Sequence, residues 1–196
     1  MSLTTTTNPA VRIVDGAEVP AAGAYALDAS HSQVGFAVRH LMVSKTKGRF
    51  SDFAGTIQTG ENPLESSVEV TIQAASVDTR DEQRDGHLRS GDFFDAEAYP
   101  TLSYASRSVR PAGKDGHYVV EGDLTIKGVT QPVPLELTFE GGATDPWGGV
   151  RVGFSAKAEL DREAFGLSWN QALETGGVLV GKKVTIEIEA EAVKQA

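Results

Sequence analysis

The sequence predicts an all-β protein with antiparallel strands, arranged as a two-sheet sandwich or as a closed barrel. The main observation is that apolar residues recur at every second position through most of the chain, as in Val34, Phe36 and Val38. One apolar and one polar face are typical of antiparallel strands with water on one side of the sheet. The second observation is that short segments rich in Gly and Pro separate these runs, as turns separate neighbouring strands.

Each later run of alternating residues is expected to form a strand. The apolar positions of these runs are Val68, Val70 and Ile72; Tyr118, Val120, Leu124 and Ile126; Val133, Leu135, Leu137 and Phe139; Val152, Phe154, Ala156, Ala158 and Leu160; and Val184, Ile186 and Ile188. Segments 114–116, 127–129 and 145–149 have the composition of hairpin turns. Pro132 and Pro134 cannot donate a ladder hydrogen bond, so this run is expected to start at an edge, a bulge or a rim.

One crowded segment, RDGHLRSGDFFDAEAYP at residues 84–100, does not alternate. Thr79 followed by Glu82 forms a capping box, which predicts a short helix starting near Arg80. Gly86 weakens this helix by about 1 kcal/mol relative to Ala, and Leu88 is its clearest apolar anchor. Such a helix is expected to lie across the end of a barrel. A second long connection, residues 160–183, precedes the last strand and is expected to be functional or capping.

Length and charge limit the classes of protein. With 196 residues the chain is long enough for one domain with a sizeable core. Residues 1–22 are expected to form a flexible or loosely docked arm and residues 23–196 the domain. The net charge of −9 argues against nucleic acid or an anionic membrane as the main partner.

The first residues lack a basic stretch followed by an apolar run, so they do not resemble a secretory signal. No stretch approaches the length of about 18 apolar residues that a membrane-spanning helix needs. We therefore expect a cytoplasmic protein. The absence of cysteine excludes disulfides and thiolate chemistry.

Signals for catalysis are weak. Ser32 follows His31 and Asp85 precedes His87, but the Gly-x-Ser-x-Gly elbow of many hydrolases is missing. The histidines match no metal-binding helix motif, and we predict no metal site, although His31 and His40 could both meet other groups at one barrel mouth. A lipid-modifying hydrolase or metal-dependent enzyme at that mouth remains an alternative to binding.

The periodicity leaves the barrel interior undecided. A barrel of about eight strands can be filled by its own side chains or can hold one slender ligand. A packed interior would indicate a structural or interaction module, whereas a hollow one would accept a long hydrocarbon.

Several motifs taken together resemble the YceI-like family of bacterial lipocalin-like proteins that bind polyisoprenoids and related lipids. They are YALDASHSQVGFAVRHL, KGRFSDFAGTI, VDTRDEQRDGHLRSGDFFDAEAYPTLSY, GDLTIKGVTQPVPLEL and DREAFGL, in the family's order from about Tyr25 to Ala190. The resemblance implies an extended antiparallel β-barrel with a long apolar cavity, a short capping helix and no covalent chemistry. Many relatives have a signal peptide and work in the periplasm.

On this basis we expect a non-catalytic carrier of a polyisoprenoid, a prenyl quinone or a similar amphipathic lipid, with no other cofactor. A homodimer is one assembly that the sequence leaves open. The predicted tunnel residues are Val34, Phe36, Val38, Val70, Ile72, Phe93, Phe94, Leu135, Leu137, Phe154 and Ile186. Phe93 and Phe94 are expected to seal the apolar end, with Asp85, His87 and Arg89 in structural hydrogen bonds. The predicted head-group residues are His31, His40, Arg49, Arg162 and Trp169.

Overall fold

A computed structural model describes residues 8–174 and 176–196 of the chain. Strands dominate it. They are β1 (Val11–Val14), β2 (Ala17–Pro20), β3 (Gly23–Leu27), β4 (Gln33–His40), β5 (Ser44–Phe50), β6 (Phe53–Thr59), β7 (Ser67–Gln73), β8 (Val77–Asp78), β9 (Thr101–Pro111), β10 (His117–Ile126), β11 (Val129–Pro132), β12 (Leu135–Thr144), β13 (Val150–Asp161) and β14 (Val180–Lys194). The helical elements are α1 (Glu82–Arg89) and the 3-10 turns η1 (Pro63–Glu65), η2 (Ala74–Ser76) and η3 (Arg162–Phe165).

The large sheet of the described residues closes into an eight-stranded antiparallel barrel. Four barrel positions are each formed by two successive strands, β3 with β4, β5 with β6, β7 with β8, and β11 with β12. The long strand β14 pairs with β13 on one side and with both β3 and β4 on the other, which closes the ring. The prediction of an all-β fold is confirmed, and the closed barrel decides between the two expected arrangements.

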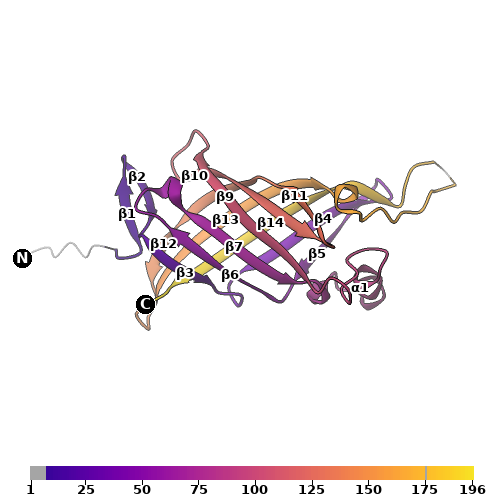
Figure 1. The fold of residues 1–196 in the computed structure, drawn as a ribbon, viewed down its shortest axis with the longest axis horizontal. Coiled ribbons are helices and arrows are strands. Elements are labelled where there is room, and N and C mark those ends of the chain that lie inside the picture. Colours follow the sequence, from indigo (N-terminus) through magenta and orange to yellow (C-terminus); the bar gives the residue numbers. More distant parts are fainter. Residues whose placement is uncertain (1–7, 175) are drawn as a thin grey trace, which may run out of the picture.

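The barrel is elongated and its two ends differ (Figure 1). At one end lie the β1–β2 hairpin and the C-terminus, and we call it the hairpin end. At the other end lie α1, the turn between β4 and β5, and the connection between η3 and β14, and we call it the helix end. No helix in the described ranges is long and apolar enough to span a membrane.

Residues 11–20, expected in a flexible or loosely docked arm, instead form the β1–β2 hairpin. Asp15 and Gly16 have φ angles of 52° and 87°, the conformation of a two-residue hairpin turn that Asp-Gly favours. Ala10 and Val19 are fully buried, so the hairpin is packed against the rest of the protein. The Asp15–Gly16 pair is the signal in the sequence that predicts this turn. Residues 1–7 of the expected arm lie outside the described residues.

The helix α1 lies at the end of the barrel, as expected, but its predicted N-cap is wrong (Figure 1). Asp81 caps the helix, with its carboxylate accepting a 3.0 Å hydrogen bond from the Arg84 backbone amide. Thr79 is buried, and its hydroxyl donates to Asp85. The Thr79 hydroxyl is thus bonded to the Asp85 carboxylate and does not cap the helix. This hydrogen bond holds α1 to the strand that precedes it.

The turn predictions are confirmed. Lys127 and Gly128, with φ angles of 50° and 72°, connect β10 to β11, and the Asp145–Gly149 segment connects β12 to β13. Pro132 ends β11, a strand that pairs with β10 alone among the described strands. Strand β12 begins only at Leu135, after Pro134. The proline-containing run is therefore split at the barrel rim.

Candidate lipid cavity

The barrel encloses a cavity of about 870 Å³. Inward-facing side chains of the barrel strands form its wall, because alternate residues of each strand point to the same face. All the predicted tunnel residues lie on this wall: Val34, Phe36, Val38, Val70, Ile72, Phe93, Phe94, Leu135, Leu137, Phe154 and Ile186. The interior of the barrel is therefore hollow.

The fully buried polar side-chain atoms of the described residues already have partners. The hydroxyl of Tyr104, on the cavity wall, contacts the carbonyl oxygens of Val120 and Val133 at 3.1 and 3.2 Å. Burial raises the pKa of Tyr104 well above its ordinary value, so the phenol stays neutral. Across the described residues, no buried side-chain nitrogen or oxygen lacks a hydrogen-bond partner. The interior thus presents mainly hydrocarbon surface to a ligand.

Two glycines shape this wall. A Cβ on Gly48 would come within 2.4 Å of the Phe36 ring, which lies across that glycine from the neighbouring strand. A Cβ on Gly122 would meet the Tyr104 ring at the same distance. Each aromatic ring therefore lies flat against the wall and leaves the centre of the barrel free.

Part of the interior at the hairpin end is filled. Tyr25, Val152 and Ala192 have almost no exposed surface and form a second core cluster there. Phe139 and Phe154, with ring centroids 5.5 Å apart, lie between this cluster and the cavity. Packed side chains therefore fill the interior around Tyr25, while the cavity wall extends toward this end as far as Pro20, Thr59 and Ser67.

The arginines and histidines that line the cavity all belong to the helix end. We call six of the lining residues there the polar rim: Arg39, His40, Asp81, Gln83, Arg84 and His87. The guanidinium of Arg84 donates to the hydroxyl and carbonyl of Thr79 at 2.7 and 2.9 Å. In the described part of the chain, the side chains of Arg39 and His40 make no hydrogen bond or ion pair, so they are available to a ligand.

An aromatic contact holds the segment after α1 to the connection that precedes β14. The His87 ring meets the Trp169 ring edge-on at 4.6 Å and the Phe93 ring at 5.1 Å. Phe93 and Trp169 are 5.4 Å apart, and the Nε2 atom of His87 lies 2.9 Å from Asp92. We call His87, Phe93 and Trp169 the aromatic clasp. Phe93 and Phe94 thus lie at the polar end of the cavity, which corrects the expectation that they seal its apolar end.

The structural roles expected in the helical segment are confirmed. Asp85 accepts hydrogen bonds from the backbone and hydroxyl of Thr79. Arg89 donates to the carbonyls of Ala75 and Val77 at 2.8 and 3.0 Å. These contacts hold α1 in place across the barrel end.

Arg162 is nearly fully buried beside the cavity. Its guanidinium donates to the carbonyls of Leu167, Trp169, Val180 and Gly181 and so fixes the long connection before β14. Desolvation lowers the pKa of Arg162, although the group remains charged at neutral pH. Its main role is to position the connection, and it adds positive charge near the polar rim.

The predicted head-group residues are separated. His40, Arg162 and Trp169 line the cavity, whereas His31 and Arg49 do not. Arg49 pairs with Asp78 at 3.1 Å, and its side chain is half exposed. His31 precedes β4 and His40 ends it, so about nine extended residues at ~3.3 Å each place them roughly 30 Å apart. The expectation that His31 and His40 meet at one mouth is wrong for that reason.

Sequence reasoning missed Arg39, Gln83 and Arg84 as residues of the rim. Arg39 alternates with the inward residues of β4, and this pattern indicated an outward position. Gln83 and Arg84 lie in the first turn of α1. The prediction that this helix lies across the end of the barrel is the signal that could have placed them beside the cavity.

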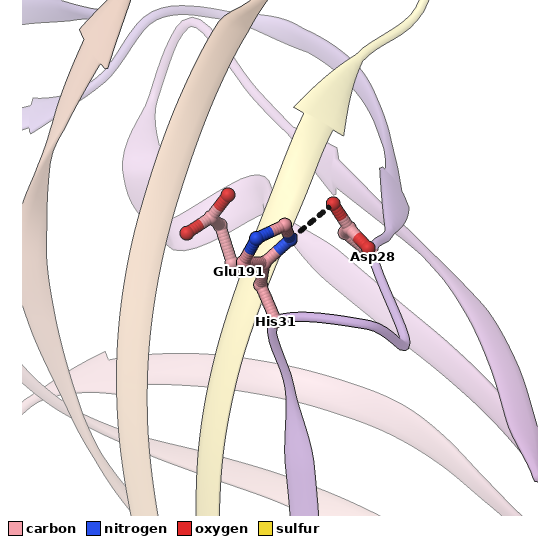
Figure 2. Close-up of side chains that lie close together, drawn as sticks. All are labelled: Asp28, His31 and Glu191. Carbon is pink, nitrogen blue, oxygen red and sulfur yellow. Dashed lines mark hydrogen bonds and ion pairs between the residues drawn. The ribbon is translucent and has the colours of Figure 1, made fainter. Parts of the chain in front are cut away.

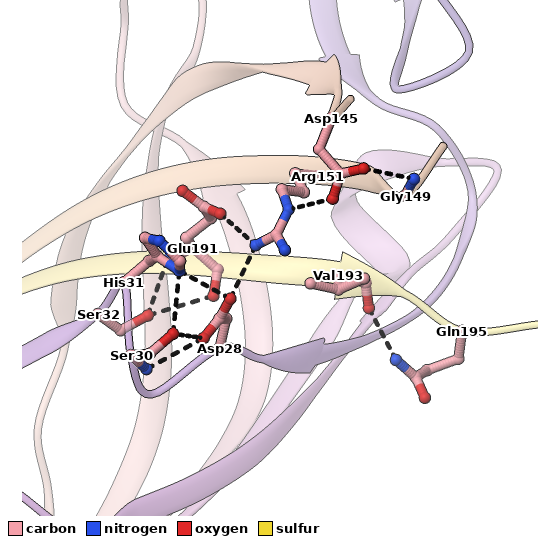
Figure 3. Close-up of polar contacts among 10 residues, drawn as sticks. All are labelled: Asp28, Ser30, His31, Ser32, Asp145, Gly149, Arg151, Glu191, Val193 and Gln195. Atoms are coloured by element: carbon pink, nitrogen blue, oxygen red, sulfur yellow. Dashed lines mark hydrogen bonds and ion pairs between the residues drawn. The ribbon is translucent and has the colours of Figure 1, made fainter. Parts of the chain in front are cut away.

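His31 belongs to a polar cluster near the hairpin end (Figures 2 and 3). Its Nδ1 atom lies 2.9 Å from Asp28 and 3.0 Å from the Ser30 hydroxyl. Serine catalysis needs the base to hold the nucleophile with one ring nitrogen and the carboxylate with the other. Here Ser30 and Asp28 share the same nitrogen, so the trio lacks the geometry of a catalytic triad. Ser32 instead exchanges hydrogen bonds with the Glu191 backbone.

Asp28, His31 and Glu191 also have the spacing of a metal-ligand group. However, one guanidinium nitrogen of Arg151 lies 2.7 Å from Asp28 and 2.5 Å from Glu191, and Nε lies 2.7 Å from Asp145 (Figure 3). We call Asp28, Asp145, Arg151 and Glu191 the ionic clasp. Hydrogen bonds from Ser30, Arg151 and His31 hold the pKa of Asp28 well below its usual range. Arg151 therefore already supplies the positive charge that these carboxylates require.

The YceI-like domain family matches residues 25–192. The chain belongs to the YceI-like family. A UPF0312 protein of Staphylococcus aureus (strain USA300) is 38% identical over 169 residues, which cover 85% of this chain and 95% of the relative. The resemblance inferred from the sequence motifs is thus confirmed.

Solved YceI-like barrels have the same fold. BcnA of Burkholderia cenocepacia aligns with a TM-score of 0.74 and 25% identity, covering 84% of this chain and 98% of BcnA. The YCEI protein of Campylobacter jejuni aligns with a TM-score of 0.69 and 28% identity, over 81% and 90% of the two chains. A polyisoprenoid binding domain from Saccharophagus degradans aligns with a TM-score of 0.67 and 17% identity, over 87% and 98%. At that identity the last similarity concerns the fold alone.

Proposed function

We propose that this protein binds a long-chain amphipathic lipid, such as a polyisoprenoid or a prenyl quinone, in its barrel and carries it without chemical change. The observation that carries the proposal is the hydrocarbon-lined cavity of about 870 Å³. This volume lies in the upper part of the range of roughly 300–1,000 Å³ that is usual for small-molecule sites. Membership of the YceI-like family supports the same ligand class.

The ligand's tail lies along the barrel. Strand β13 has 12 residues, and at about 3.3 Å per residue it follows the wall for roughly 40 Å. Moving one methylene out of water is worth about 0.8 kcal/mol before the costs of binding. At a net gain of about 0.3 kcal/mol per heavy atom, a five-carbon prenyl unit contributes about 1.5 kcal/mol. Tail length therefore dominates affinity.

The ligand's head lies at the polar rim. Arg39 and His40 supply donors that have no partner within the described residues, and Gln83 and Arg84 line the same region. These groups favour a head with hydrogen-bond acceptors, such as a quinone or a phosphate. Trp169 and Arg162 lie next to this site, whereas His31 and Arg49 have no part in it.

The protein acts by binding and not by catalysis. His87, on the cavity wall, contacts Asp92 and is packed between two aromatic rings. Among the described residues of that wall, no histidine is hydrogen-bonded to a serine or threonine hydroxyl. The arrangement therefore lacks the paired base and nucleophile that hydrolysis of a lipid ester requires.

Two measurements test the proposal. Organic extraction of the purified protein followed by mass spectrometry should recover a long-chain lipid. Titration with prenyl quinones of increasing length should strengthen binding by roughly ten-fold for each added prenyl unit, until the cavity is filled. The His40→Ala variant should weaken binding by the same factor for short and long tails, because His40 contacts the head group and not the tail. The proposal is wrong if extraction recovers nothing and no prenyl quinone binds.

A further inference from the structure

The turn between β4 and β5 exposes three consecutive apolar side chains. Leu41, Met42 and Val43 are 38%, 60% and 80% exposed. They connect two strands at the helix end, and we call them the apolar tip (Figure 1). Fold stability gives no reason to place large apolar groups in water at a hairpin turn.

The backbone of the apolar tip is also unfavourable for its residues. Leu41 and Met42 have φ angles of 52° and 60°, and the Val43 amide donates to the His40 carbonyl at 3.1 Å. Two successive left-handed residues at the centre of a β-turn are the conformation that Asn-Gly favours. Leu and Met adopt it only at a cost in free energy. A strained conformation of this kind motivates a functional hypothesis when it coincides with a second unusual feature.

Basic residues flank the apolar tip. Arg39, Lys45 and Lys47 are exposed, and none of them makes an ion pair within the described residues. Arg39 and Lys45 lie directly opposite each other on β4 and β5, an arrangement that is destabilising for like charges. The chain as a whole carries a net charge of −9, so this concentration of positive charge runs against its overall composition.

The apolar tip lies beside the opening of the cavity. The Leu41 amide donates to the carbonyl of Leu179 at 2.9 Å, and both Leu179 and the neighbouring His40 line the cavity. A surface that held the tip would therefore lie next to the polar rim.

We propose that the apolar tip inserts shallowly into an anionic lipid bilayer, while Arg39, Lys45 and Lys47 contact its head groups. Exposed apolar side chains beside unpaired basic ones are characteristic of segments that lie in a membrane interface. A bilayer fits better than a protein groove because the tip adjoins the opening of a hydrocarbon-lined cavity. Docking would bring this opening to the membrane surface, where a lipid could pass into the barrel. This inference goes beyond lipid binding, since it concerns a surface outside the cavity.

The hairpin end provides an internal control. Trp147 is 86% exposed, but it lies in the turn that contains Asp145. The nearby Arg151 is held by the carboxylates of the ionic clasp. Trp147 therefore offers apolar surface without the unpaired basic residues that surround the apolar tip.

Vesicle flotation tests this inference. The purified full chain should bind vesicles of phosphatidylcholine mixed with phosphatidylglycerol and bind vesicles of phosphatidylcholine alone much more weakly. The Leu41→Asn/Met42→Gly variant replaces the strained turn with the sequence that its backbone favours. It should raise Tm and reduce vesicle binding by at least roughly ten-fold, because its apolar surface is lost. Lys45→Gln and Lys47→Gln should each weaken binding about five-fold at low salt.

The Trp147→Ser variant should bind anionic vesicles like the original chain. The inference is overturned if the original chain does not float with anionic vesicles, or if Leu41→Asn/Met42→Gly binds them equally well. It is also overturned if the variant abolishes only self-association, which would assign the tip to an interface between two copies. Binding of a prenyl quinone without vesicles should be unchanged in the tip variants, so failure here is distinguishable from failure of lipid binding.

Discussion

The two ends of the barrel are built largely from the same strands, but they differ in how far side chains fill the interior. At the hairpin end, Tyr25 and Val152 fill the interior, and the ionic clasp joins three segments on the outside. At the helix end, the polar rim lines a hollow, and α1 and the long connection meet through the aromatic clasp. The difference indicates that one end stabilises the barrel while the other end admits a ligand. Regions that open for a ligand generally have few buried contacts of their own.

The largest expected difference between the ends is in stability. Tyr25 is fully buried and does not line the cavity, so Tyr25→Ala should lower the free energy of unfolding by about 3–5 kcal/mol. Phe36 borders a space that is already empty, so Phe36→Ala creates little new void and should cost about 1.5 kcal/mol. Urea denaturation of both variants measures the difference. Equal losses of unfolding free energy in the two variants would contradict the claim that Tyr25 lies in a packed region and Phe36 beside a cavity.

A smaller effect is expected at the aromatic clasp. Trp169→Ala removes the contacts of the indole with His87 and Phe93, each worth about 0.5–1.5 kcal/mol. Release of a bound prenyl quinone should therefore become roughly ten-fold faster, and Tm should fall by about 2–4 °C for each kcal/mol of contact energy lost. Stopped-flow measurement of quinone release checks this prediction. Trp147→Ser, at the opposite end, should leave the rate unchanged, and an unchanged rate in Trp169→Ala would exclude a gating role for the clasp.

The smallest effect concerns the pH dependence of the ionic clasp. Because the pKa of Asp28 is depressed in the folded protein, the unfolded chain binds more protons as the pH falls. The stability that Asp28 contributes is thus complete above about pH 5 and is lost progressively below about pH 4. Asp28→Asn should flatten the dependence of unfolding free energy on pH in this range. A variant whose profile parallels that of the original chain would show that Asp28 is not responsible.

The strand residues that line the cavity could be predicted from the sequence because strands alternate strictly. Val34, Leu135 and Ile186 share a face with their apolar neighbours, and that face is the inner one. The same pattern could not distinguish a hollow from a solid interior. Both give alternating apolar residues, and only the spacing of the closed strands determines the remaining volume. The family resemblance supplied that distinction.

The polar rim was predicted less well, because it depends on contacts between segments far apart in the chain. Residue type suggested His31 and His40 equally, but the length of β4 puts them at opposite ends. Arg162 donates its hydrogen bonds to carbonyls of Leu167, Trp169, Val180 and Gly181, and the sequence between its first and last acceptors shows no regular alternation that would predict them. Two local signals in the sequence predict structure more directly. Asp15–Gly16 predicts the hairpin turn, and Asp81 predicts the helix N-cap.

The most direct test of a ligand-sized hollow is a substitution on the barrel wall whose larger side chain fills the cavity. Ala156 is a small residue of β13 that lines the cavity, and Ala54 is an exposed alanine of β6 that serves as the matched control. Ala156→Phe should leave the unfolding free energy within about 1 kcal/mol of the original and abolish binding of long prenyl quinones, whereas Ala54→Phe should change neither. A loss of about 1–3 kcal/mol in Ala156→Phe, with no effect on lipid binding, would contradict the account, because overpacking of this size is expected in a solid core.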